Sequence, residues 1–337
     1  MSKFHQQGEI VFVNPDSDYF NEYSGSATPE FIDKAHPVDS YDVVHIHFSF
    51  DKLTIEKLRG LFDCFDKIKK PVVWTCHGRE SQRAKNIGSG ELQKLLFSRS
   101  KAIITLTDGC KSWLIDTYGG QKKIETIPSG YIIDPDLIQS LKGDLDKKSR
   151  DNFVFLIGDF RMNKEINQSI INFIQCSELS GCNLTLLIKP LSIYTDSFRE
   201  LDKRTTLFWD IIKSAGQRIN VISSPEISNR LVAQVFCRSH VCLLPYLWGT
   251  HSGQIELAKD AGCYPVVSNV GFYKEQSDQI IEFEYSDKPS VFAYNFTKAM
   301  IKARSMPYLK PQTNLRKVEF AKILQKHTDV YKSVLKT

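Results

Sequence analysis

Short apolar runs alternate with amphipathic segments along most of the chain. Apolar runs of about four to eight residues are typical of buried strands, and segments with an apolar residue every three or four positions are typical of helices that cover a sheet. We therefore expect an α/β protein with parallel sheets covered on both faces. In the first half, the expected strands are 9–15, 41–48, 71–76, 102–107 and 123–128, and the expected helices are 53–68, 91–98 and 109–118.

Residues 137–152 interrupt this alternation. Their sequence, LIQSLKGDLDKKSRDN, is polar and charged without a long apolar run, which is typical of a domain boundary. We predict an N-terminal Rossmann-like domain over 1–145 and a C-terminal one over 146–337, with the last helix packing back on the first domain. Ligands of such sheets bind at the C-terminal ends of the strands, so we expect the site in a cleft between two domains. In the second half, the expected strands are 153–157, 184–189, 219–222, 241–245, 265–268 and 280–285, and the expected helices are 165–175, 207–215, 227–238, 290–305 and 315–335.

The composition is that of an ordinary globular protein, with 337 residues, 42% hydrophobic and 25% charged. Residues 1–15 hold too short an apolar core for a secretory signal, and no run approaches the roughly 18 apolar residues of a membrane helix. We therefore expect a cytoplasmic protein. The eight cysteines lack C-x-x-C spacing, which favours buried free thiols over disulfides or zinc ligands.

The net charge of +5 includes short basic clusters at 67–70, 122–123 and 147–150. Such clusters are usually solvated surface. Contact with anionic lipid at the inner face of the membrane, or with a polyanionic acceptor, is the alternative. We expect no nucleic-acid partner.

The stretch 241–271 combines a strand, a loop, a helix and a second strand. Its small polar loop, THSG, leads into the helix, and backbone N–H groups at a helix N-terminus bind anions. Glu256 lies about one turn inside this helix and can accept hydrogen bonds from a hydroxylated group. An anion beside a polyol describes a nucleotide, which we therefore predict as the ligand.

Two cations follow the first strand of the predicted second domain. In the segment GDFRMNKE, Arg161 and Lys164 come directly after Gly158 and lead into a helix. A guanidinium and an ammonium at this spacing can neutralise a diphosphate as its charge develops. A solvated surface pair is the alternative interpretation.

Histidines mark the strand ends of the predicted first domain. His77 follows a buried strand and precedes Gly78, so its imidazole is expected at the strand end. His45 and His47 alternate on one strand and share a face, where they could line the core or a cleft or form part of a metal site. Weaker candidates for an acceptor or phosphate loop are Ser24, Gly25, Ser26, Ser129 and Gly130.

Five motifs follow one another in a specific order: DVVHIHF; PVVWTCHG; AIITLTDGCKSWLIDTYG with KIETIPSG; FLIGDFRMNKE; and LLPYLWGTHSGQIELAKDAGCYPVVSNVG. Together they resemble the landmarks of the retaining GT-B glycosyltransferases of the large family 4 type, which use nucleotide-diphosphate sugars. The resemblance covers nearly the whole chain. It implies the GT-B fold, in which two Rossmann-like domains face a central cleft.

The resemblance also implies roles for single residues. In that family the His of the HG turn lies by the donor sugar, a basic pair holds the diphosphate and a Glu binds the ribose. These roles carry over to His77, to Arg161 with Lys164, and to Glu256. The other implied donor-binding residues are Gly78, Gly158, Thr250, His251, Ser252, Gly253 and Gln254.

Two positions depart from the family pattern. Gly158 and Asp159 stand where the family commonly has Gly-Arg, so Arg161 must supply the guanidinium. Trp248 stands where the last motif has its first Glu. Candidate replacements that could hold the donor hexose are Thr250, His251 and Ser252.

The expected reaction is transfer of a sugar, with retention and without a metal, to a saccharide, lipid-linked or other hydroxyl acceptor in surface glycan or glycoconjugate synthesis. A nucleotide-sugar epimerase, a phosphorylase and a binding or scaffold subunit with weakened turnover are alternatives on the same fold. A metal-dependent GT-A enzyme is a further alternative, because Asp134 with Asp136, or Asp144 with Asp146, could form its Asp-x-Asp motif.

Overall fold

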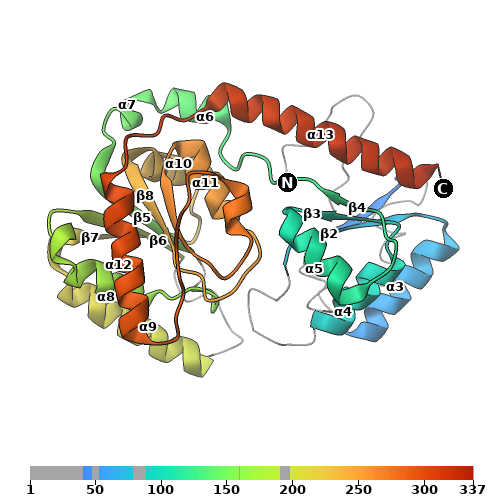
Figure 1. Ribbon diagram of the computed structural model, residues 1–337, viewed down its shortest axis with the longest axis horizontal. Helices are drawn as coiled ribbons and strands as arrows, with labels where there is room; N and C mark the ends of the chain where they lie inside the picture. The colour runs from blue at the N-terminus through green and yellow to red at the C-terminus, as the bar shows by residue number, and fades with distance from the viewer. Residues whose placement is uncertain (1–40, 48–52, 79–88, 159, 190–197, 337) are drawn as a thin grey trace. The chain divides into compact units, whose positions relative to one another are not determined.

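The computed structural model describes residues 41–47, 53–78, 89–158, 160–189 and 198–336 (Figure 1). The chain divides into two compact units. Unit 1 comprises Met1–Ser81, Asn86–Pro128 and Lys322–Thr337, and unit 2 comprises Gln82–Lys85 and Ser129–Ala321. The expected strand 9–15 and the candidate loop residues Ser24, Gly25 and Ser26 lie outside the described residues.

The described residues of unit 1 form a four-stranded parallel sheet in the order β1-β2-β3-β4. Its strands are β1 (Val44–Ile46), β2 (Val72–Cys76), β3 (Ala102–Thr105) and β4 (Ile124–Thr126). Its helices are α3 (Ile55–Lys67), α4 (Ser89–Arg99) and α5 (Asp108–Tyr118), with the C-terminal part of α13 (Thr313–Leu335).

The sequence of α3 explains why this segment is helical. Thr54 caps its start by accepting a hydrogen bond from the amide of Lys57. Leu58, Leu61 and Phe65 then recur every three or four positions and are buried.

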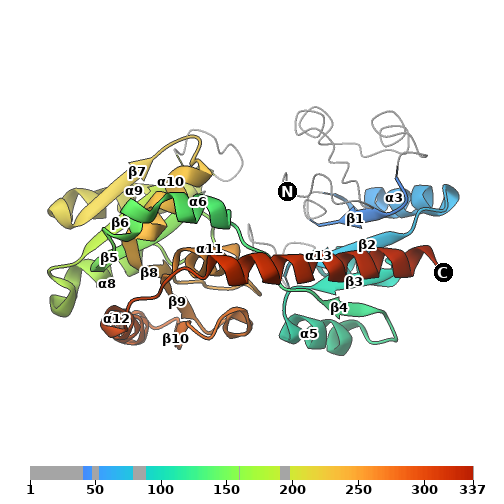
Figure 2. The same ribbon diagram turned by 90° about the horizontal axis from the view of Figure 1, so that it is seen from above.

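The C-terminal part of α13 packs on the sheet of unit 1. Ile323 and Val330 form one apolar cluster with Val73 of β2 and Ile104 of β3. The helix lies beside these strands in both views (Figure 2).

Unit 2 contains a six-stranded parallel sheet in the order β10-β9-β8-β5-β6-β7. Its strands are β5 (Ser149–Gly158), β6 (Asn183–Ile188), β7 (Ile219–Ser223), β8 (Ser239–Leu244), β9 (Tyr264–Ser268) and β10 (Ile281–Phe283). Its helices are α6 (Pro135–Ser140), α7 (Lys142–Leu145), α8 (Asn167–Gln175), α9 (Phe198–Ser214), α10 (Asn229–Arg238), α11 (Gly253–Ala261) and α12 (Pro289–Ser305).

Both faces of this sheet are buried. Along β5, Phe153 and Phe155 enter one core with α8, α9 and α12, whereas Val154 enters a second core with α10 and α11. Neighbouring residues of a strand point to opposite faces, so one apolar run serves both cores. The predicted α/β architecture with two parallel sheets is confirmed.

Residues 137–152, where we expect the domain boundary, lie within unit 2, which includes Ser129–Ala321. The structure places α6, α7 and the first residues of β5 in or beside this segment. Ile138 and Leu141 are buried there, and spaced singly among polar residues they gave no long apolar run. The helix expected at 207–215 also begins earlier, at Phe198.

All eight cysteines are free and buried, as expected from their spacing. No helix in the described part of the chain is long and apolar enough to cross a bilayer.

Candidate functional site

The turn after β5 has an unusual backbone. Gly158 ends the strand at φ +63°, a conformation that glycine adopts without a steric penalty. Phe160 follows at φ +46°, which costs a non-glycine residue about 1–2 kcal/mol. Its buried ring packs edge-on against Phe208, with 5.0 Å between the centroids, and this contact holds the strained turn.

The loop after β5 is joined to the loop after β8. The amide of Glu165 donates to the carbonyl of Pro245 at 2.8 Å, and the amide of Leu247 donates to the carbonyl of Asn163 at 2.8 Å. These bonds form an isolated antiparallel bridge between Lys164 and Tyr246, beyond the ends of the parallel neighbours β5 and β8. Lys164 lies between the two bonds, so its backbone is fixed.

Lys164 is almost fully buried, at 3% exposure. Its ammonium donates to the carbonyl of Leu156 at 2.7 Å and lies 5.6 Å from the ring centroid of Tyr246. Gln254 Nε2 donates to the same carbonyl at 3.1 Å. Two predicted donor-binding segments, far apart in sequence, therefore meet at the end of β5. Arg161 is exposed.

Ser252 caps the N-terminus of α11. Its hydroxyl accepts from the amide of Gln254 at 3.1 Å and shares a 2.6 Å hydrogen bond with the hydroxyl of Tyr246. Its own amide donates to Gln276 Oε1 at 2.7 Å, and the amide of Ile255 donates to the Ser252 carbonyl. The backbone amides of Ser252, Gln254 and Ile255 thus have partners within the chain. Of the four amides at 252–255, the amide of the exposed Gly253 is the candidate to bind the predicted anion.

Glu256 is buried in an ion cluster. Its Oε2 accepts from Arg316 at 2.7 Å and its Oε1 accepts from Gln276 at 3.2 Å, with only 2% of the residue exposed. Arg316 also donates to Asp260 Oδ1 at 2.7 Å and to Glu319 at 2.6 Å. Both oxygens of Glu256 therefore bind protein groups in this structure, and contact with a ribose stays a prediction.

Burial sets the ionisation of this cluster. It raises the pKa of Glu256 and of Asp260, and the charge of Arg316 opposes that rise. Burial lowers the pKa of Arg316, but the two carboxylates raise it by more, so the guanidinium stays charged.

The second oxygen of Asp260 accepts from the amides of Ile132 and Ile133. Glu256 and Asp260, four positions apart on α11, therefore share Arg316 as a structural partner.

His77 lies in unit 1 beside the histidines of β1. Its Nε2 is 3.1 Å from His47 Nδ1, and His47 Nε2 is 3.3 Å from His45 Nδ1. Gly78 accepts a hydrogen bond from Gln93 through its carbonyl. Within the described residues, no three His, Cys, Asp or Glu side chains are arranged to hold a metal ion.

The remaining predicted residues have mixed surroundings. Thr250 is buried, and its carbonyl accepts from Phe272 at 2.9 Å, whereas His251 is half-buried. Gly130 lies against Phe320, because a Cβ there would be 2.7 Å from the ring. Close packing against Phe320 therefore explains why residue 130 is a glycine. Ser129 is the residue before it in the chain.

The carboxylates of the GT-A alternative have structural roles. Asp134 caps α6 by accepting from the amide of Asp136, and Asp144 pairs with Arg238. Asp134 and Asp136 lie at the start of α6, and Asp144 and Asp146 lie at the end of α7. Neither of these two Asp-x-Asp segments directly follows a buried strand.

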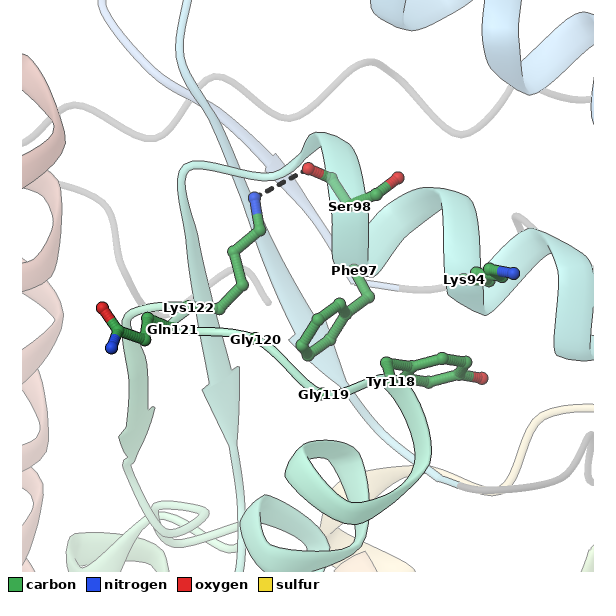
Figure 3. A pocket seen from close by; sticks show the side chains of 8 residues that line it. All are labelled: Lys94, Phe97, Ser98, Tyr118, Gly119, Gly120, Gln121 and Lys122. Atoms are coloured by element: carbon green, nitrogen blue, oxygen red, sulfur yellow. Dashed lines mark hydrogen bonds between the residues drawn. The ribbon is translucent and has the colours of Figure 1, made fainter.

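A surface pocket of about 280 Å³ lies on unit 1 (Figure 3). Phe97 of α4 and Tyr118 of α5 form one side, and Lys122 reaches across to the carbonyl of Ser98 at 2.7 Å. No predicted site residue lines it.

Sequence reasoning missed three site residues. Tyr246 follows the buried strand β8, and an aromatic residue at a strand end was a usable signal. Gln276 and Arg316 had no such signal, because they lie 20 and 60 residues from Glu256.

The chain is similar to known proteins in part of its sequence and in its fold. Residues 5–135 match the family model Glycosyltransferase Family 4. No curated protein sequence matches the chain at a significant level.

Solved structures share the fold at low sequence identity. Sucrose-phosphate synthase from Thermosynechococcus elongatus matches with a TM-score of 0.57 and 14% identity, covering 96% of this chain and 82% of that one. Anabaena HepE in complex with UDP matches with 0.60 and 13%, covering 90% and 82%. A trehalose-phosphate synthase from Burkholderia xenovorans in complex with glucose-6-phosphate matches with 0.63 and 11%, covering 92% and 76%.

The family match and the structural matches point to the same fold. The described chain has the GT-B fold of these glycosyltransferase structures, and its N-terminal segment is similar to the Glycosyltransferase Family 4 model. The GT-B fold implied by the five motifs is confirmed.

Proposed function

We propose that the chain transfers a sugar from a nucleotide-diphosphate sugar to an acceptor hydroxyl with retention of anomeric configuration, in surface glycan or glycoconjugate synthesis. The observation that carries this proposal is the meeting of Lys164 and Gln254 at the Leu156 carbonyl, beside the capped N-terminus of α11. The UDP bound to HepE and the glucose-6-phosphate bound to the Burkholderia enzyme support a nucleotide donor and a saccharide acceptor.

The chemistry follows from the charges at this place. An ammonium has three N–H donors, and the Leu156 carbonyl takes one of them from Lys164. The positive charge of Lys164 can attract the diphosphate at this place, with the exposed Arg161 adding a second cation. These cations stabilise the leaving diphosphate as its charge develops. The leaving phosphate itself accepts the proton of the acceptor hydroxyl, so no side-chain nucleophile is required.

Binding of nucleotides tests the donor site. We expect UDP, GDP or ADP to raise the melting temperature, because a ligand that binds only the folded state stabilises it. Arg161→Gln and Lys164→Met should each weaken this binding about 10- to 150-fold, the loss of one charge-assisted hydrogen bond. Lys213→Gln is the matched control, since the side chain of Lys213 is 78% exposed on α9.

The proposal fails if none of the three nucleotides stabilises the wild-type protein, or if both variants bind as well as the control. Arg161 is exposed, so its variant still reports on binding if Lys164→Met does not fold.

Metal independence and retention are tested together. We expect full activity in excess chelator, because Arg161 and Lys164 supply the positive charge that a metal supplies in other enzymes. Proton NMR of the first product should show the anomeric configuration of the donor. Loss of activity in chelator, or an inverted product, would contradict the respective part of the proposal.

A binding subunit with weakened turnover is the second candidate. The ion pair of Glu256 with Arg316 and the Trp248 in place of a carboxylate favour it. Nucleotide binding by calorimetry without sugar transfer to any acceptor would support this candidate. A sugar converted without an acceptor would instead indicate an epimerase, and phosphate-dependent cleavage a phosphorylase.

A further inference from the structure

The side chain of Gln276 binds the start of α11 through three hydrogen bonds. Its Oε1 accepts from the backbone amide of Ser252 at 2.7 Å, and its Nε2 donates to the carbonyl of Ser252 at 3.2 Å and to Glu256 Oε1 at 3.2 Å. A primary amide has two N–H donors, so both are used, and its oxygen accepts the third bond. One side chain therefore fixes the backbone of residue 252 and the carboxylate one turn further along the helix.

The backbone of Ser252 has the conformation that such a contact requires. It is extended, with φ −143° and ψ 125°. In an extended segment the N–H and C=O groups of one residue point to the same side, where a neighbouring strand can bind both. The side-chain amide of Gln276 takes the place of such a strand. Because an N-cap residue needs a non-helical backbone, Gln276 stabilises the conformation from which α11 begins.

Gln276 belongs to a segment that packs against the loop before α11. The amide of Phe272 donates to the carbonyl of Thr250 at 2.9 Å. The ring of Tyr273, 1% exposed, stacks on the ring of Tyr246 with 5.1 Å between the centroids. The segment after β9 is thus joined to the loop after β8 at several points, and Gln276 reaches α11 from a fixed position.

A neutral amide suits this place better than a charged group. Glu256 is 2% exposed, and its second oxygen accepts from Arg316. The N–H of Gln276 gives this buried carboxylate another donor. A carboxylate at position 276 would instead bring two negative charges into contact, and one of them would then have to bind a proton.

We propose that Gln276 is a positioning residue of the donor site. It holds the backbone of Ser252 and the carboxylate of Glu256 in one arrangement, so that the amide of Gly253 and Glu256 together face the diphosphate and the ribose of the donor. This role rests on the proposed function, in which these two groups bind the donor. Gln276 itself needs no contact with the ligand.

Calorimetric titration tests this role, with whichever of UDP, GDP and ADP stabilises the wild-type protein most. Gln276→Ala removes all three hydrogen bonds and should weaken nucleotide binding about tenfold at pH 8 and at pH 5.5. Gln276→Glu should weaken it about tenfold at pH 8 but bind like the wild-type protein at pH 5.5, because a protonated carboxyl group donates to Glu256 as the amide does. Each affinity is compared with that of the wild-type protein at the same pH.

A nearby glutamine provides the matched control. Gln279→Glu adds the same charge three positions further along the chain and should bind the nucleotide like the wild-type protein at both pH values. Equal losses in Gln276→Glu and Gln279→Glu would assign the effect to charge alone and contradict the proposal. Wild-type binding by Gln276→Ala, or a loss in Gln276→Glu that does not recover at pH 5.5, would overturn it.

Hydrogen exchange measures the same contact without a nucleotide. In the free protein, the amide of Ser252 should exchange about tenfold faster in Gln276→Ala than in the wild-type protein, because it has lost its acceptor. The amide of Glu165, which donates to the carbonyl of Pro245, should exchange equally in both proteins. Faster exchange of both amides would indicate a general loss of stability and contradict the positioning role.

The two measurements separate this proposal from the proposed function. If the wild-type protein binds none of the three nucleotides, the proposed function fails, while the exchange of the Ser252 amide still decides whether Gln276 fixes the start of α11. An unchanged exchange rate of Ser252 in Gln276→Ala would overturn the role of Gln276, whatever the protein binds.

Discussion

At the scale of single residues, Arg316 contacts three carboxylates. Its guanidinium, 3% exposed, binds Glu256, Asp260 and Glu319. The partners explain why two carboxylates can be buried on one face of α11. Removing one partner of such a cluster is more damaging than removing the whole cluster, because it leaves uncompensated charge in the interior.

Replacing this arginine tests the cluster. Arg316→Leu should lower the free energy of unfolding by about 3–5 kcal/mol at pH 8. The pKa of Glu256 and Asp260, already raised by burial, should rise further, so the loss should be smaller at pH 5 where these groups bind protons in the folded state. Urea unfolding at both pH values measures this.

The adjacent residue supplies the control. Lys317 pairs with Asp136 at the exposed surface, and Lys317→Leu should unfold like the wild-type protein. A pH-independent loss in Arg316→Leu would contradict the assignment of buried carboxylates.

The buried histidines predict a second pH effect. Burial lowers the pKa of His47 to about 4 and lowers the pKa of His45 and His327, whereas unfolded histidine titrates near 6.5. Between these values the unfolded chain binds more protons, so stability should fall as the pH decreases from about 6.5 to 4. His240 in unit 2, with a pKa lowered to about 4, acts in the same direction.

His47→Gln isolates one of these contributions. The slope of unfolding free energy against pH in this window should decrease by up to about 1.4 kcal/mol per pH unit, the value for one proton. Urea unfolding at several pH values between 4 and 7 measures it. Identical slopes for the variant and the wild-type protein would show that His47 is protonated in the folded state.

At the scale of elements, α13 has two different surroundings along its length. Near its start, Arg316 binds α11 of unit 2, and further on Ile323 and Val330 enter the core of unit 1. The apolar side chains in the second part of α13 should therefore contribute to the stability of unit 1, although the helix as a whole is weakly amphipathic.

A pair of substitutions on α13 tests this packing. Ile323→Ala should lower the free energy of unfolding by about 2–5 kcal/mol, because Ile323 is 5% exposed and its loss leaves a cavity. Val318→Ala, on the same helix but 52% exposed, should have little effect. Equal stability of the two variants would mean that the second part of α13 is not packed on the sheet.

At the scale of the whole molecule, the candidate functional groups are distributed over two units, each built on a parallel sheet. Unit 2 contains the buried lysine, the capped helix N-terminus and the ion cluster around Glu256. Unit 1 contains the neighbouring histidines His45, His47 and His77. Lys164 and His77 each follow the end of a parallel strand, where ligands of α/β sheets bind.

The sequence by itself determined the elements and the order of the motifs. Local periodicity was sufficient, because an apolar run such as 153–157 and an amphipathic segment such as 53–68 each encode their structure over neighbouring residues. It also located Lys164 in a loop after a strand and Gln254 at the start of a helix, since strand, loop and helix are contiguous in the chain. It did not reveal α6 and α7, in and beside 137–152, where single buried residues give no apolar run.

Only the tertiary structure decided the contacts of the site. Arg316 and Glu256 are 60 positions apart, and His45 and Tyr331 are 286 apart, so no local pattern connects them. The same holds for the meeting of Lys164 with Gln254, which depends on β5 and β8 being neighbours in the sheet. The residues around a side chain in the sequence are the same whether that side chain contacts a ligand or an ion-pair partner. Which of the two it contacts is decided by the segments that the fold brings next to it.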